Sequence, residues 1–202
     1  MNSVEGRVCV VTGAARGLGR AIAAALGVAG GRLALCDVLA DELEDTAAEL
    51  REAGCEVFAA PCDVSDSISV DAFFAQVEQA LGSVEVLVNN AALVPGGPED
   101  EVRRGRHYAY LTTPELRTSL GFTSAMSDAD WLKYWGVNVH GVFFCTRAAL
   151  RQMEPRRYGR IVNIASIAGI SALSAHSPHY SATKGAVIAF TRSVGAEVAG
   201  AN

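Results

Sequence analysis

A glycine-rich segment near the start of the chain restricts the fold more than any other feature. Residues 7–12 form a short valine-rich run typical of a strand buried on both faces. A glycine loop follows at once, and an alanine-rich helix is expected over residues 20–29. Glycines in this context let the backbone approach a pyrophosphate, and the helix N-terminus offers it free N–H groups. The segment therefore predicts a dinucleotide site formed by Gly13, Arg16, Gly17, Leu18 and Gly19, with an ordinary tight turn as the alternative.

The alternation of strands and helices continues along the chain. Further strands are expected over residues 32–36, 56–61, 84–88 and 160–165, and further helices over residues 39–53, 66–81, 127–155 and from Pro178 onward. Strands that alternate with amphipathic helices predict parallel pairing with right-handed crossovers. The fold class is therefore α/β, with a parallel sheet between two helix layers, in a single domain over residues 1–202.

An acidic residue ends the second predicted strand. Asp37 lies near the point, about 20 residues after the glycine loop, where dinucleotide-binding units place a carboxylate that accepts from the ribose 2′-hydroxyl. A carboxylate repels a 2′-phosphate, so Asp37 predicts NAD rather than NADP. Arg16 argues mildly for NADP, because it could reach a phosphate. The alternative role for Asp37 is to cap the next helix.

Polar residues also follow the other predicted strands. Asp63 and Val64 come after the third strand, Asn90 after the fourth and Ser166 after the fifth. In an open parallel sheet, ligands bind beyond the carboxyl ends of the strands. These residues are therefore expected at the same edge of the sheet as the glycine loop.

Tyr180 and Lys184 stand four residues apart in the last predicted helix, which Ser177 and Pro178 mark as N-cap and first helical position. The spacing places both side chains on one helix face. An ammonium favours the phenolate and lowers a tyrosine pKa, so such a pair can serve as general acid/base for an alcohol or carbonyl. A solvated helix face is the alternative.

Asn138 interrupts an otherwise apolar helix that Ser127 and Asp130 open as an acidic capping box. Asparagine is a poor helix former, and when buried it needs polar partners. Either a local kink that holds water or a catalytic proton path would account for it.

Residues 93–126 break the rhythm of strands and helices. They begin with turn-forming residues 95–98, continue with balanced charges, and contain Tyr108, Tyr110, Pro114, Phe122 and Met126 without clear periodicity. We expect an inserted loop, either a mobile excursion or a lid over the substrate lined by the aromatic residues.

Composition excludes several functional classes. The net charge is −5 without a basic block, so nucleic acid is not an expected partner. No apolar run is long enough to span a membrane, and the polar start does not resemble a signal peptide. The five cysteines form no Cys-x-x-Cys motif and are expected to be reduced thiols of a cytoplasmic protein. The four histidines show no metal-ligand spacing, so no metal is expected.

Taken in order, the motifs resemble those of the short-chain dehydrogenase/reductase family. They are Thr12-Gly13-x-x-x-Gly17-x-Gly19, Asp63-Val64, Asn89-Asn90-Ala91-Ala92, Asn138-x-x-Gly141, Ser166 and Tyr180-x-x-x-Lys184. The resemblance implies a Rossmann-like, doubly wound sheet and an oxidoreductase that transfers a hydride between NAD and a secondary alcohol or ketone, with 3-oxoacyl and hydroxysteroid compounds among the substrates.

The resemblance also implies roles for individual residues. Tyr180 would be the acid/base, and Lys184 would bind the nicotinamide ribose. Ser166 would hydrogen-bond the substrate oxygen, and Asn138 would order a water that links Lys184 to solvent. Asp63 and Asn90 would lie on the adenosine side. A homodimer through the helices at 127–155 and 178–199 is the partner that the family suggests.

Four features depart from the family pattern. The interval from Ser166 to Tyr180 is one residue longer, Ala92 replaces a frequent glycine, and the segment after Asn90 is long. The sequence ends at Asn202, without the last two family strands and the substrate lid, so we expect residues 160–165 to form a sheet edge. A nucleotide-binding or interaction remnant without turnover is the alternative function. The related epimerase/dehydratase group is disfavoured by the spacing of the glycines.

Overall fold

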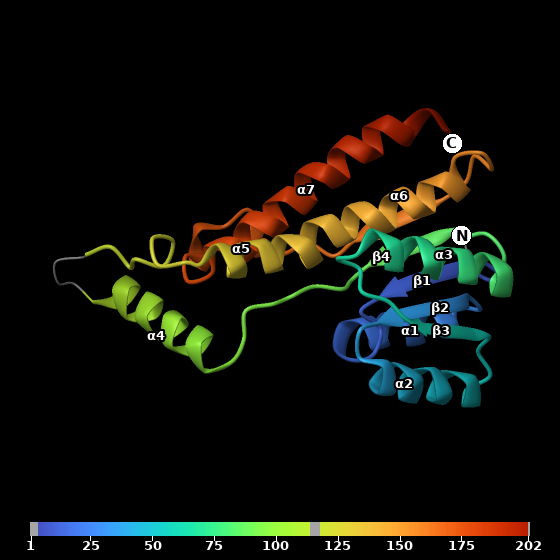
Figure 1. The fold of residues 1–202 in the computed structure, drawn as a ribbon, viewed down its shortest axis with the longest axis horizontal. Helices are drawn as coiled ribbons and strands as arrows, with labels where there is room; N and C mark the ends of the chain where they lie inside the picture. Colours follow the sequence, from blue (N-terminus) through green and yellow to red (C-terminus); the bar gives the residue numbers. More distant parts are fainter. Residues whose placement is uncertain (1–3, 114–117, 202) are drawn as a thin grey trace.

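The computed structural model describes residues 4–113 and 118–201. Five parallel strands form one sheet in the order β3-β2-β1-β4-β5. Their bounds are Val8–Thr12 (β1), Arg32–Asp37 (β2), Val57–Pro61 (β3), Val86–Asn89 (β4) and Arg160–Asn163 (β5). The chain moves outward from β1 to β3 and then returns to the other side of β1, which is the doubly wound arrangement that the sequence predicts (Figure 1).

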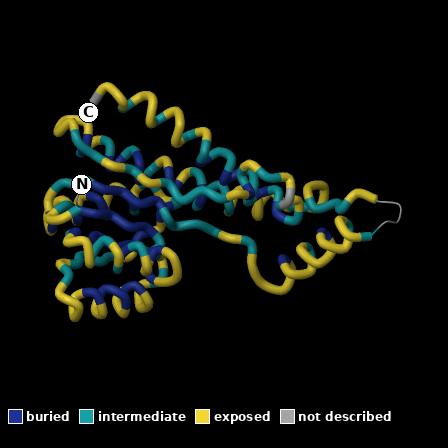
Figure 2. The backbone as a smooth tube through the Cα atoms, turned by 180° about the vertical axis from the view of Figure 1, so that it is seen from behind, coloured by how far each residue is buried: buried dark blue, intermediate teal, exposed yellow. Residues whose placement is uncertain are grey.

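Helices cover both faces of this sheet, as Figure 1 shows. On one face, α1 (Gly17–Val28) and α2 (Ala40–Glu52) pack over Val11, Leu33 and Leu35. On the other, α3 (Ser67–Leu81) and α6 (Gly141–Met153) pack over Val10 and Leu87. Successive strand residues point to opposite faces, so both faces of β1 are apolar and buried (Figure 2). The predicted three-layer α/β/α architecture is confirmed.

A long helical rod runs beside α7 (Pro178–Val198). The rod consists of α5 (Asp128–Trp135), a π-helical turn η1 (Gly136–His140) and α6. The Ser127 Oγ accepts a hydrogen bond from the Asp130 N–H at 3.0 Å, so the predicted cap is formed. Asn138 lies within the π turn, so the helix is locally widened at a poor helix former.

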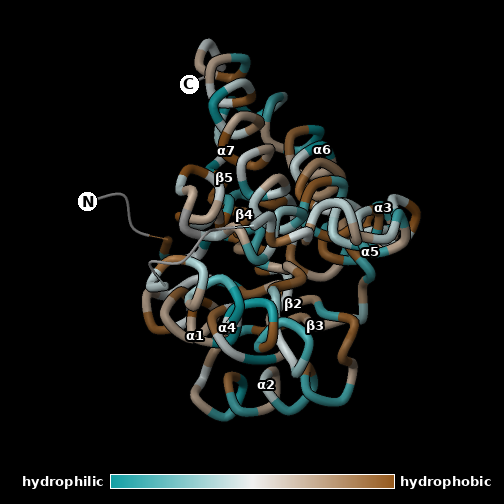
Figure 3. Tube along the Cα trace, turned by 90° about the vertical axis from the view of Figure 1, so that its left-hand side faces the viewer, coloured by the Kyte–Doolittle hydropathy of each residue, from teal (hydrophilic) through white to brown (hydrophobic). Residues whose placement is uncertain are grey.

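Residues 93–126 are not a loop throughout, and this part of the prediction was wrong. Residues Pro98–Thr112 form helix α4, whose exposed surface is largely hydrophilic (Figures 2 and 3). Pro98 occupies the first turn together with three acidic residues, which favour a helix N-terminus. The buried residues of α4 are the polar Asp100 and His107, so the sequence has no apolar stripe from which this helix could be predicted. Tyr108 is 62% exposed, and Pro114 lies outside the described residues. The lid over the substrate stays a prediction.

The remaining turns are short. The interval between Ser166 and Tyr180 contains two 3₁₀ turns, η2 (Ile167–Gly169) and η3 (Ala172–Ser174), and η4 (Ala199–Ala201) follows α7. Within the described residues β5 pairs with β4 alone, so the predicted edge position is confirmed, and Val162 is 48% exposed there. All five cysteines are free thiols. None of the described helices combines the length and the apolar character that a membrane crossing requires.

Candidate active site

The carboxyl ends of the strands border an open cleft of about 660 Å³, which we call the sheet-edge cleft. Most residues predicted from the sequence line it: Gly13, Arg16, Leu18, Gly19, Asp37, Asp63, Val64, Asn90, Tyr180 and Lys184. Gly17, Asn138 and Ser166 are not part of its lining. The lining also includes residues that the sequence did not single out, among them Cys62, Leu93, Val94 and Val137. Cys62 directly follows the predicted strand 56–61, and Leu93 follows the Asn89-Asn90-Ala91-Ala92 motif, which was the available signal.

Two glycines let the loop after β1 fold against the cleft floor. A Cβ on Gly19 would lie 1.9 Å from the Gly13 carbonyl oxygen, and a Cβ on Gly13 would lie 2.7 Å from the Ala91 Cα. Gly13 also has φ +66°, in the left-handed region. Side chains at these two positions would push the loop away from β4 and fill the space at the start of α1.

Asn90 fastens the glycine loop to the end of β4. Its Nδ2 donates to the carbonyl oxygens of Thr12 and Gly13, both at 3.0 Å. The Thr12 Oγ1 accepts from the N–H groups of Asn90 and Ala91 at 3.1 and 3.0 Å. These four contacts fix the cleft floor before any ligand binds. Thr12 therefore helps to form the site, although its place at the start of the glycine motif did not predict this role.

Asp37 stands at the end of β2 and faces the same loop. Its Oδ2 accepts from the Ala15 N–H at 3.0 Å, and its Oδ1 accepts from the Leu39 N–H at 3.2 Å. The N-cap of α2 is Leu39, so the alternative role of Asp37 as helix cap was wrong. Arg16, which could attract a phosphate, is exposed and forms an ion pair of 3.6 Å with Glu42.

Asp63 and Val64 shape the opposite wall. The Asp63 Oδ1 accepts from the N–H and Oγ of Ser65 at 2.9 and 2.7 Å. A Cβ on Gly141 would lie 2.8 Å from the Val64 Cγ2, so the glycine allows α6 to approach this wall closely. The glycine of the Asn138-x-x-Gly141 motif therefore has a packing reason.

Tyr180 and Lys184 occupy the first two turns of α7 and share a face, as their spacing predicts. The Lys184 Nζ lies 5.7 Å from the centroid of the Tyr180 ring and donates to the Ile164 carbonyl oxygen at 2.7 Å. Lys184 is only 3% exposed, and burial lowers the pKa of its ammonium group below the usual value. A Cβ on Gly169 would lie 2.7 Å from the Lys184 carbonyl carbon, so η2 packs directly on this turn.

Ser166 and Asn138 are not among the residues that line the cleft; Ser166 is half-buried and Asn138 is buried. The Ser166 Oγ accepts from the Ala168 N–H at 3.1 Å, which leaves its O–H available as a donor. The Asn138 Oδ1 accepts from the Leu93 N–H at 2.7 Å. The Asn138 Nδ2 donates to the Leu93 carbonyl oxygen at 2.9 Å and to the Thr183 Oγ1 at 3.1 Å. Asn138 thus ties the segment after β4 to the turn of α7 between Tyr180 and Lys184.

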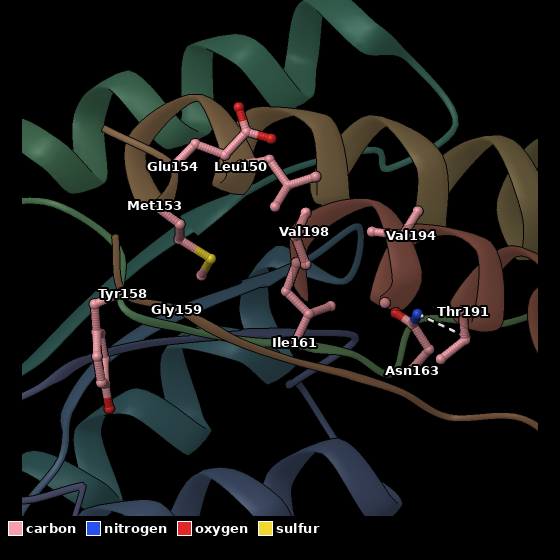
Figure 4. A pocket seen from close by; sticks show the side chains of 11 residues that line it. Leu150, Met153, Glu154, Tyr158, Gly159, Ile161, Asn163, Thr191, Val194 and Val198 are labelled. Atoms are coloured by element: carbon pink, nitrogen blue, oxygen red, sulfur yellow. Dashed lines mark hydrogen bonds between the residues drawn. The ribbon is translucent and has the colours of Figure 1, made fainter. Parts of the chain in front are cut away.

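A second, smaller pocket lies elsewhere on α7. It has a volume of about 170 Å³ between α6, α7 and β5, where Asn163 points toward Thr191 and donates to it at 2.9 Å (Figure 4). None of the predicted site residues lines this pocket. Across residues 4–113 and 118–201, no three His, Cys, Asp or Glu side chains are grouped as a metal site would require.

Relatives of this chain include dehydrogenases and reductases. The chain is 30% identical to the 2,3-dihydro-2,3-dihydroxybenzoate dehydrogenase of Bacillus subtilis, with 97% of this chain and 66% of the relative aligned. It is 34% identical to a sorbitol dehydrogenase of Cereibacter sphaeroides, with 95% of this chain and 64% of the relative aligned. The chain therefore spans about two thirds of the length of these relatives.

Solved structures give the same result. An actinorhodin polyketide ketoreductase crystallised with NADPH superposes with a TM-score of 0.81 at 36% identity, covering 98% of this chain and 67% of that one. A short chain dehydrogenase/reductase from Burkholderia phymatum in complex with NAD also has a TM-score of 0.81, at 31% identity, covering 100% and 63%. The family profile described as short chain dehydrogenase matches residues 7–202. The chain belongs to the short-chain dehydrogenase family.

Proposed function

We propose that the chain carries the site of an NAD-dependent oxidoreductase that interconverts a secondary alcohol and a ketone. One observation carries this proposal: a buried lysine and a tyrosine stand side by side on α7, at the same cleft as the glycine loop. A phenol beside an ammonium is suited to proton exchange with an alcohol or carbonyl oxygen.

The residues present fit a dinucleotide. The space beside Gly13 and Gly19 is open only because both lack a Cβ, and α1 begins there with its free N–H groups. Asp37 would hold the adenosine ribose, Asp63 and Val64 would flank the adenine side, and Lys184 would hold the nicotinamide ribose. The cleft volume is in the usual range for cofactor sites.

In the proposed reaction, bound NAD would accept the hydride from the alcohol carbon. The Tyr180 oxygen takes the alcohol proton in the oxidative direction and returns it to the carbonyl oxygen in the reductive direction. The Ser166 hydroxyl donates to the same substrate oxygen and orients it. The Lys184 ammonium supplies positive charge beside Tyr180, and Asn138 holds the turn of α7 on which both depend through Thr183.

The substrate side of the cleft is apolar, with Leu93, Val94 and Val137 in its lining. Two of the similar proteins are a polyketide ketoreductase and a sorbitol dehydrogenase by name. We therefore place the substrate among secondary alcohols and ketones, without choosing between acyl and sugar-like compounds.

A homodimer through the rod and α7 is also proposed. Val139, His140, Val142, Phe143, Val187 and Phe190 form a hollow on these two helices that is almost entirely apolar. Phe143 is 42% exposed although its ring packs edge-on against the Phe190 ring, with 6.3 Å between the ring centroids. Apolar surface of this kind is typical of helix interfaces between protomers.

Thermal unfolding with added NAD or NADP tests the cofactor assignment. NAD should raise the midpoint, with about 2.7 kcal/mol of stabilisation at a hundredfold excess over its dissociation constant, and NADP should raise it less. Asp37→Ser should reverse the order, since the carboxylate that repels a 2′-phosphate is gone. No shift with either nucleotide would contradict the proposed function and favour a remnant without turnover. An unchanged preference in Asp37→Ser would contradict only the role of Asp37.

A separate prediction concerns the stability cost of Lys184. Lys184→Met should abolish turnover yet raise the unfolding midpoint at neutral pH, because the buried ammonium has no carboxylate partner among the ion pairs of the described residues. The unfolded chain binds this proton more tightly than the folded one, so native stability rises with pH above the lowered pKa of Lys184. The advantage of the variant should therefore shrink toward alkaline pH. A lower midpoint in Lys184→Met at neutral pH would show that the hydrogen bond to Ile164 outweighs desolvation.

A further inference from the structure

A group of buried and half-buried polar side chains joins α4 to the start of the Tyr180 helix, outside the sheet-edge cleft. It consists of Asp100, Arg103 and His107 of α4, Tyr134 of α5, and His176 and His179 before and within the first turn of α7. We call this group the α4 clasp. None of its members lines the cleft or has a part in the proposed chemistry.

The direct contact between α4 and the chain before α7 is a pair of histidines. The Nδ1 atoms of His107 and His176 are 3.4 Å apart, and the ring centroids are 5.6 Å apart. His107 is 5% exposed. Two nitrogens at this distance can share one proton, with one ring donating and the other accepting, whereas two protonated rings would place two donors and two positive charges face to face.

The rest of the clasp is polar and incompletely paired. Asp100 is 5% exposed, accepts from the Gly96 N–H at 2.5 Å and forms an ion pair with Arg103. The Arg103 Nε, the Ser177 Oγ and the His179 Nδ1 are buried without a hydrogen-bond partner in the described part of the chain. We call α4 and the residues that lead into it, 93–112, the arm. Polar contacts of this kind hold the arm less firmly than an apolar core would.

The clasp reaches the catalytic helix through an aromatic contact. The His179 ring packs edge-on against the Tyr134 ring with 4.0 Å between centroids, and His179 immediately precedes Tyr180. His179 is 2% exposed. The first turn of α7 is therefore wedged between α5 and the arm that carries α4.

Charges from every neighbouring element act on the two histidines of the α7 side. Burial lowers the pKa of His176 first, the His107 ring lowers it next, Arg104 and Arg103 lower it further, and Asp100 opposes them. Burial likewise lowers the pKa of His179, Arg103 adds to this, and Asp100 and Asp130 oppose it. Tyr134 is neutral near physiological pH, because burial raises its pKa. The docked arrangement therefore favours neutral histidines.

We propose that the α4 clasp is an acid-sensitive fastening: neutral His176, in contact with His107, holds α4 against the start of α7, and protonation of His176 releases the arm. The released state carries histidines with an ordinary pKa of about 6.5. Docking is therefore at full strength above that pH and weakens as the pH falls below it toward the lowered pKa of docked His176. A protonated His176 would carry its positive charge in a partly buried place beside Arg103 and Arg104, so docking responds within the pH range where histidine titrates.

Hydrogen exchange of the whole chain, at about pH 7.5 and about pH 5.5, tests this proposal. After correction for intrinsic exchange rates, peptides covering Pro98–Thr112 should exchange about tenfold faster at the lower pH, the factor that one pH unit of linked titration produces. Peptides of β1 and β4 should keep their protection at both pH values. His176→Gln, which retains a neutral hydrogen-bonding side chain, should remove the pH dependence of α4. His140→Gln is the matched control, since His140 contacts Phe144 on the rod, and it should behave like the native chain.

Two results would overturn the proposal: equal α4 protection at both pH values in the native chain, or an undiminished acid response in His176→Gln. If α4 of His176→Gln is already unprotected at neutral pH, the pKa of His176 in the native chain is measured instead, from the NMR shifts of its ring protons as a function of pH. That pKa then decides between the two outcomes. A pKa below the ordinary value of about 6.5 supports the clasp, and one at or above it refutes the clasp. These readouts need neither NAD nor turnover, so their outcome is independent of the proposed function.

Discussion

Replacing Tyr180 by phenylalanine is expected to lower kcat by about 10²- to 10⁴-fold, the usual share of a positioned acid/base, in the oxidation of secondary alcohols with NAD. The phenol oxygen is the group that exchanges a proton with the substrate oxygen, and phenylalanine keeps the ring but not the oxygen. The fold should not suffer, because Tyr180 is only partly buried and its ring packing is retained. The NAD-induced rise in the unfolding midpoint should therefore persist while turnover disappears.

The matched control is Tyr158→Phe. Tyr158 lies after α6, where its ring stacks under Arg7 at 4.1 Å, and it lines the smaller pocket rather than the cleft. This variant loses the same hydroxyl group and should keep its turnover. Activity of Tyr180→Phe within tenfold of the parent would exclude Tyr180 as the acid/base.

Replacing Gly19 by alanine is expected to weaken NAD binding strongly. The added Cβ would stand 1.9 Å from the Gly13 carbonyl oxygen and 2.6 Å from the Asn90 Nδ2, so the loop has to move. Overpacking of this kind costs about 1–3 kcal/mol or more, which is about fivefold to about 150-fold or more in affinity where the displaced backbone is itself the binding surface. Isothermal titration with NAD measures the loss, and the unfolding midpoint of the free chain should fall as well.

Gly195→Ala separates this local effect from a general intolerance of glycine replacement. Gly195 lies inside α7, and beyond its own helical turn no atom comes within 4 Å of the position that an alanine methyl group would take. Alanine favours a helix interior by about 1 kcal/mol over glycine. This variant should bind NAD normally and unfold at a slightly higher temperature. Equal NAD affinity in Gly19→Ala and the parent would mean that the ligand does not approach the loop.

The sequence was sufficient for the sheet and for most of the predicted residues that line the cleft. Valine-rich runs that alternate with amphipathic helices admit few arrangements, and residues that follow parallel strands must meet at one edge. Asp37, Asn90 and Lys184 could therefore be placed together from their positions in the chain, and the structure brings them to one cleft. The role of each residue in binding or turnover stays a prediction.

The features that the sequence did not predict depend on buried polar groups and on contacts between residues far apart in the chain. Helix α4 buries Asp100 and His107 instead of an apolar stripe, so the periodicity on which helix prediction depends is missing. Ser177 occupies the predicted N-cap position of α7, yet its Oγ makes no capping hydrogen bond and remains buried without a partner in the described residues. The clasp joins histidines 69 residues apart, and nothing local in the chain records such a contact.

The hydrogen bonds of Asn138 affect how freely the segment between Leu93 and Asn138 can change in length and sequence. The hydrogen bonds to Leu93 join residues 45 positions apart and close the whole excursion into a loop whose two ends are fixed on the rigid body. Because closure entropy grows only logarithmically, doubling such a loop costs about 0.6 kcal/mol. Segments of different length and sequence could therefore be exchanged between these anchors without moving α7. One side-chain amide would thus let new substrate preferences evolve on an unchanged catalytic frame.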